Sequence, residues 1–126
     1  AVALRKEEEQ RSKEMAFRLT AKWNEPTMFH VRDTIRALFV LDHKSEEFKA
    51  SIRAKETNVI HFLNFLEEVG IAIEKGGADP AVLKEAYGGV VLKAWGKLQD
   101  WVKDQRAEYG QPRIWIYVED LAKKWN

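Results

Sequence analysis

The chain has 126 residues, 45% of them apolar and 33% charged, which suits one globular domain with a well-charged surface. Its 21 basic and 20 acidic side chains leave a net charge of +1, which argues against a protein that binds long nucleic acid through overall charge. The absence of cysteine excludes disulfides and thiolate metal ligands, and no apolar run approaches the ~20 residues of a membrane span.

The first predicted element is a charged helix over residues 1–24. Residues 5–14 hold four basic and four acidic side chains, and pairs such as Glu7–Arg11 fall one helical turn apart. Apolar residues gather only toward Trp23, which we expect to dock this helix onto a bundle domain of residues 25–126 or onto a second copy. We interpret residues 1–24 as a helix or stalk. The AVAL start is either the tail of a membrane helix upstream of Ala1 or an ordinary helix start.

The bundle domain shows helical spacing of its apolar residues throughout. Helices are predicted over the following segments: 26–41, 45–75 (with a possible bend near 57–58), 80–87, 90–109 and 113–125. Gly76-Gly77 and Gly110 are predicted to end the helices before them, and we expect Gly88-Gly89 to break or kink the chain. The sequence therefore predicts an all-α fold, a single-domain helical bundle of five or six helices with a charged N-terminal helix.

Two polar residues interrupt the apolar stripe of residues 59–77. Asn64 and Glu67 lie three positions apart, beside core-facing positions. Buried polar groups must be hydrogen-bonded, so we expect a structural clasp that ties this helix to Arg106 or to a tryptophan indole N–H. The alternative is that Glu67 binds a ligand cation or acts as a base.

The C-terminal half carries a pattern that is similar to a known family. The residues that carry it are Leu63-Asn64, Glu67, Gly76-Gly77, Arg106 and Trp125. This pattern resembles a bacterial domain family of unknown function, whose members often have an N-terminal membrane helix followed by a cytosolic helical domain. The resemblance implies a cytoplasmic domain at the inner face of the bacterial membrane, and it implies no chemistry.

Cations and aromatic rings interleave near the C-terminus. The candidate ligand-binding residues are Arg106, Arg113, Trp115, Lys123 and Lys124. Bases stack on aromatic rings while Arg and Lys hold phosphates, so this set suits a small anionic nucleotide. Helical geometry suggests that Trp115 is exposed. The alternative is that Lys123 and Lys124 only neutralise the helix C-terminal dipole.

No catalytic or metal-binding signature occurs in the chain. The three histidines, His30, His43 and His61, lack the spacing of a metal site, and no phosphate loop or nucleophile elbow is present. We predict no metal, no cofactor and no enzymatic activity.

Three functional hypotheses follow. The leading one is a non-enzymatic cytosolic sensor or interaction domain of a bacterial, membrane-tethered protein. By layout alone, the chain also resembles CRISPR-associated membrane effectors of antiviral defence that bind cyclic oligoadenylate. The third is a structural oligomerisation subunit, and a homo-oligomer is expected in each case.

Overall fold

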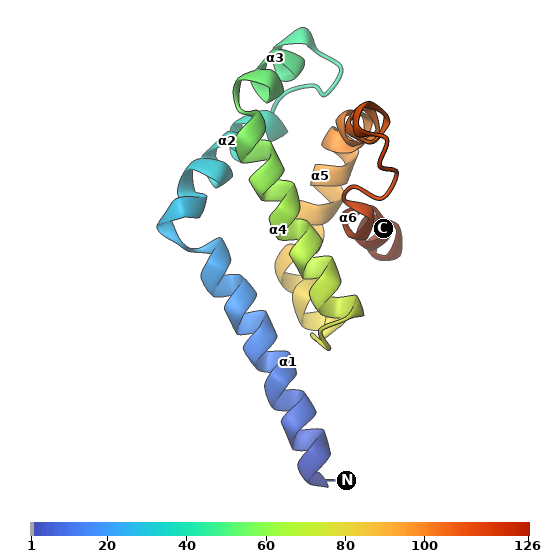
Figure 1. The fold of residues 1–126 in the computed structure, drawn as a ribbon. Helices are drawn as coiled ribbons and strands as arrows, with labels where there is room; N and C mark the ends of the chain where they lie inside the picture. Colours follow the sequence, from blue (N-terminus) through green and yellow to red (C-terminus); the bar gives the residue numbers. More distant parts are fainter. Residues whose placement is uncertain (1) are drawn as a thin grey trace.

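The computed structural model describes residues 2–126, with side chains from residue 3 onward (Figure 1). Its elements are α1 (Val2–Trp23), the 3-10 turn η1 (Pro26–Met28), α2 (Phe29–Phe39), α3 (Glu46–Ala54), α4 (Glu56–Glu74), α5 (Pro80–Tyr109) and α6 (Ile116–Trp125). Every regular element in this range is helical, which confirms the predicted all-α bundle. Within residues 2–126, no helix combines the length and the apolar character that crossing a membrane requires.

Helix α4 forms the centre of the bundle. Its largest fully buried side chains are Phe62, Phe65, Leu63, Leu66, Val59 and Val69. Helices α1, α2, α3, α5 and α6 all pack against it. Figure 1 shows α4 running between α1 and α2 on one side and α5 and α6 on the other. Because α4 is enclosed from several directions, it buries more than the single stripe of a surface helix.

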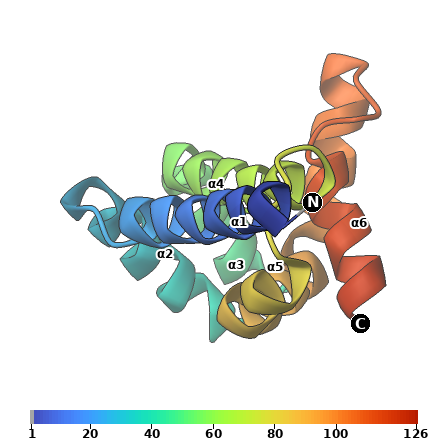
Figure 2. The same ribbon diagram turned by 90° about the horizontal axis from the view of Figure 1, so that it is seen from below.

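Helix α1 joins the bundle only through its C-terminal half. Leu19 is buried, and the Trp23 ring lies 4.8 Å from the Phe65 ring between centroids. The Thr20 and Tyr87 hydroxyls share a hydrogen bond of 3.3 Å. Residues 3–11 are exposed, and Figure 1 shows this end of α1 extending past the other helices, while Figure 2 shows α1 in front of them when the molecule is seen from below.

The predicted segment 45–75 is divided into two helices. The break falls at Lys55, two residues before the expected bend at 57–58. Ser45 starts α3 as its N-cap, since its Oγ accepts a hydrogen bond of 3.1 Å from the Phe48 N–H.

The predicted break at Gly88-Gly89 is wrong, because α5 continues through both glycines. Gly88 is buried, with room for no more than a methyl group before Lys84 and Trp125 are reached. A glycine within a helix costs about 1 kcal/mol, which the burial of Leu83 and Val91 on either side exceeds.

The last helix begins later than the pattern predicts. Helix α5 ends at Gly110, whose φ of 62° is the left-handed conformation that glycine adopts at low cost. A loop then runs to Trp115, which has a φ of 53°, and α6 starts at Ile116 rather than at Arg113. After this loop α6 packs on both α4 and α5.

Candidate functional site

The polar residues of α4 hold the N-terminus of α6. The Asn64 Oδ1 accepts a hydrogen bond of 2.9 Å from the Trp115 indole N–H, and the Glu67 Oε1 accepts one of 2.9 Å from the Val118 backbone N–H. Trp115 occupies the N-cap position and offers no capping side chain. A carboxylate from a neighbouring helix therefore does what an N-cap residue usually does, and it meets the positive end of the α6 dipole.

Arg106 of α5 completes this arrangement. Its Nε donates to the Ile114 carbonyl at 2.8 Å, and its Nη1 donates to the Glu119 carboxylate at 2.6 Å. The guanidinium also lies over the Trp95 ring, 5.7 Å from its centroid. We call Asn64, Glu67, Arg106, Trp115 and Glu119 the α6 anchor, since together they fix the loop before α6 and its first turn.

The two carboxylates of the α6 anchor have opposite pKa shifts. Burial raises the pKa of Glu67, against the lowering effect of the Val118 and Tyr117 N–H groups and of Arg106. The pKa of Glu119 is lowered, first by its hydrogen bond with Lys123, and Arg106 lowers it further, so that the two cations together outweigh the raising effect of burial. The α6 anchor thus contains one carboxylate that resists ionisation and one that favours it.

Two sequence expectations about the α6 anchor are corrected. Asn64 is exposed rather than buried, because it sits at the edge of the α4–α6 contact and not within the core stripe. The expected exposure of Trp115 is also wrong, since its side chain is only 9% exposed. A helix through Trp115 would expose its ring, but this residue lies in the left-handed turn before α6, and its ring is buried in the bundle. There it stacks on Trp101 at a centroid distance of 5.5 Å.

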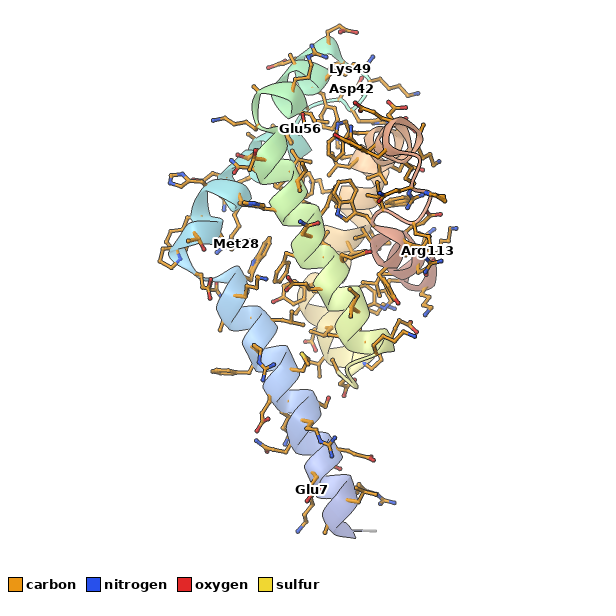
Figure 3. The ribbon with its side chains drawn as sticks, viewed as in Figure 1. Glu7, Met28, Asp42, Lys49, Glu56 and Arg113 are labelled. Carbon is orange, nitrogen blue, oxygen red and sulfur yellow. The ribbon has the colours of Figure 1, made fainter. Side chains whose placement is uncertain are left out.

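Four of the five residues of the predicted ligand set make polar contacts within the chain. Arg106 and Trp115 belong to the α6 anchor. Lys123 pairs with Glu119 at 2.8 Å and Lys124 pairs with Glu74, and each carboxylate raises the pKa of its lysine. Arg113 is exposed, and Figure 3 shows it beside α6, on the side of the bundle away from α1. Ligand binding by this set stays a prediction.

A cleft between α3 and α5 was not anticipated from the sequence. It has a volume of about 350 Å³, and its lining includes Lys44, Lys49, Arg53, Asp100, Trp101 and Asp104. The apolar spacing of α3 indicates only which face of that helix is buried. It does not indicate that α5 lies opposite α3, because that depends on the tertiary arrangement. No local signal in the sequence therefore identifies this cleft.

The histidines do not converge. His30 and His61 are exposed, and His43 lies 3.9 Å from the adjacent Asp42 carboxylate. Within residues 2–126, no group of three or more histidine or acidic side chains is arranged to hold a metal ion.

The fold and the α6 anchor define a small all-α domain whose last helix is fastened to a central helix by polar side chains. The chain belongs to the family described as "Domain of unknown function (DUF4760)", whose model matches residues 1–125. The prediction of a domain family of unknown function is therefore confirmed, and the match extends over the N-terminal half as well. No curated protein and no solved structure matches the chain.

Proposed function

We propose that this protein is a non-enzymatic helical sensor or interaction domain, carried on α1 as a stalk and held at the cytoplasmic face of a bacterial membrane. In this proposal residues 1–24 are the stalk and residues 25–126 are the domain that it presents. A membrane helix would lie upstream of Ala1, which is outside the described residues.

The observation that carries the proposal is the character of the projecting part of α1. Residues 3–11 are exposed, and most of them are charged. The Arg11–Glu7 pair, 4.0 Å apart, is a one-turn pair of the kind that stabilises a helix without a core. A stable helix that is polar on all sides is one that bridges through solvent between two structures or is held by one-turn side-chain pairs. Figure 3 shows Glu7 on this part of α1, away from the bundle.

Cell fractionation tests the tether. The natural gene, with a C-terminal tag, is expressed in its bacterium, and the membranes are washed with alkaline carbonate. We expect the tag in the membrane fraction, protected from protease in spheroplasts and released from inverted vesicles by cleavage within α1. The matched control is the same gene shortened to begin at Ala1, which should move the tag to the soluble fraction. A tag that is soluble from the natural gene would contradict the tether.

Two alternatives predict different behaviour. An oligomerisation subunit predicts a discrete homo-oligomer of the purified chain, measurable by native mass spectrometry. A cyclic oligoadenylate effector predicts capture of that ligand by the oligomer and loss of capture in Arg113→Ala. The ion pairs of Lys123 and Lys124 within the chain give the second alternative less support than the stalk.

A further inference from the structure

We propose that the cleft between α3 and α5 binds a free nucleoside mono- or diphosphate. Its cations, its aromatic floor and its carboxylates match the three parts of such a ligand: phosphate, base and ribose. The inference goes beyond the stalk proposal and does not depend on whether the protein is tethered.

The floor of the cleft is apolar and held in place. Phe48 and Ile52 of α3 are 2% and 4% exposed, and Trp101 of α5 is half-buried. The Trp101 ring stacks on Trp115 at an interplanar angle of 24°, and Asn64 in turn fixes the Trp115 indole. Because this ring is already ordered, a base that stacks on Trp101 needs little further ordering of the protein.

The α3 side of the cleft supplies positive charge. Lys44 precedes α3, while Lys49 and Arg53 lie one turn apart along it. All three are exposed, and in the part of the chain that the structure describes their one ion pair is the 3.5 Å contact between Lys49 and Glu46. Figure 3 shows Lys49 at the α3 end of the molecule. Arg and Lys placed in this way bind phosphate oxygens through charge-assisted hydrogen bonds.

The α5 side supplies hydrogen-bond acceptors. Asp100 and Asp104 are one turn apart on the same face and line the cleft. Carboxylates accept hydrogen bonds from ribose hydroxyls, as the acidic residue of dinucleotide-binding folds does. Lys97 donates to the Leu41 carbonyl, which ties the segment before α3 to α5 and helps to shape this side of the cleft.

The size of the cleft favours a single nucleotide. Its volume of about 350 Å³ is at the lower end of the roughly 300–1,000 Å³ that is typical of ligand pockets. A cyclic oligonucleotide would extend beyond these walls.

The test is a titration of the ¹⁵N-labelled chain with ADP, followed through the backbone and tryptophan indole signals. We expect ADP to shift the Trp101 indole signal and leave Trp23, on the far side of α4, unchanged. Adenosine and inorganic pyrophosphate should each bind more weakly than ADP, because each contacts only part of the cleft. The double variant Lys44→Gln/Arg53→Gln should weaken ADP binding at least about tenfold, since charged hydrogen bonds are lost.

The matched control is Arg5→Gln/Lys6→Gln, which removes the same charge from the projecting part of α1 and should leave ADP affinity unchanged. Asp104→Asn should weaken ADP and adenosine but not pyrophosphate. The proposal is overturned if millimolar ADP shifts no cleft signal, or if both double variants weaken binding equally. Tighter binding of cyclic oligoadenylate than of ADP at the same residues would also overturn it.

Discussion

Helices α1 and α4 have similar lengths, 22 and 19 residues, yet they are stabilised in different ways. Eight residues of α4 are buried, whereas Leu19 is the one buried residue of α1 among its described side chains. Most of the stability of a helix in a protein comes from tertiary packing, so α4 depends on burial, whereas the exposed start of α1 depends on local charge pairs. The bundle and the projecting start of α1 should therefore respond differently to the same substitution.

The largest expected difference comes from removing a phenylalanine from each helix. Phe62 of α4 is fully buried, and Phe17 of α1 is 78% exposed. Phe62→Ala should lower the free energy of unfolding by about 3–5 kcal/mol, through lost burial and a cavity. Phe17→Ala should change it by less than about 0.5 kcal/mol. Equilibrium denaturation in urea measures both.

Phe62→Ala leaves open the case in which the variant does not fold, so Phe62→Leu serves as a milder companion. It should remain folded and lose less stability than the alanine variant. Equal losses for Phe17→Ala and Phe62→Ala would show that the outer face of α1 is buried in solution, for example against a second copy, and would contradict the stalk.

A second pair of variants adds a methyl group to a helical glycine. A Cβ on Gly70 of α4 would lie 2.7 Å from the Tyr117 Cβ and 3.2 Å from the Tyr117 carbonyl oxygen. Gly70→Ala should destabilise by about 1–3 kcal/mol, because α6 must move away from α4. Gly89 is exposed and has no neighbour within 4 Å of such a Cβ. Gly89→Ala should stabilise by about 0.5–1 kcal/mol, as alanine is the better helix former.

Thermal unfolding of both glycine variants shows directly whether each substitution stabilises or destabilises the protein. Gly96→Ala, at another open position of α5, is the matched control and should behave as Gly89→Ala does. If Gly70→Ala were as stable as the parent, the close approach of α4 and α6 would be wrong.

The two carboxylates of the α6 anchor should contribute to folding stability with opposite pH dependence. The folded-state pKa of Glu67 is raised above its ordinary value of 4.5, so the native state binds more protons than the unfolded state as pH rises above 4.5. The stabilising contribution of Glu67 is therefore complete below pH 4.5 and is lost as pH rises through the folded pKa. Glu119 has a lowered pKa, so its contribution is present above 4.5 and is lost as pH falls through its folded pKa.

Urea unfolding of the parent, Glu67→Gln and Glu119→Gln between pH 3 and 7 tests this contrast in about the range where carboxylates titrate. The stability difference between parent and variant should fall with increasing pH for Glu67 and rise for Glu119. The glutamine at position 67 retains an oxygen that accepts the Val118 N–H, so the cap survives the substitution. If the parent–variant differences in unfolding free energy changed in the same direction with pH for both residues, the opposite pKa shifts of Glu67 and Glu119 would be contradicted.

Local signals in the sequence were sufficient for most of the helix boundaries. Ser45, Pro80 and Gly110 act through their own backbone or capping geometry, and each marks an end as expected. The stripe of α4 was equally clear, because apolar spacing reports burial directly. The failures arose where tertiary packing outweighs a local preference, as at Gly88-Gly89.

The candidate sites were less predictable for the same reason. The position of Trp115 depends on its own left-handed backbone conformation, and the sequence has no glycine or asparagine at this position to predict it. Asn64 and Glu67 stood out from the sequence because polar residues interrupt an apolar pattern. Their actual partners are the indole and backbone N–H groups of residues beyond α5, and these can be assigned only after α6 is placed.

The smallest expected effect lies within the projecting part of α1. Glu7 and Arg11 are each more than two-thirds exposed, and such one-turn pairs contribute about 0.3–0.5 kcal/mol, which salt screens. The cycle Glu7→Gln, Arg11→Gln and the double variant should show a coupling of this size in the amide hydrogen exchange of residues 3–11. Global unfolding should not register it, since this part of α1 opens without the bundle. Coupling that persists at high salt, or that lowers the unfolding midpoint of the whole chain, would mean that these turns belong to the bundle's cooperative unit. The boundary between stalk and domain at residue 24 would then have to be moved.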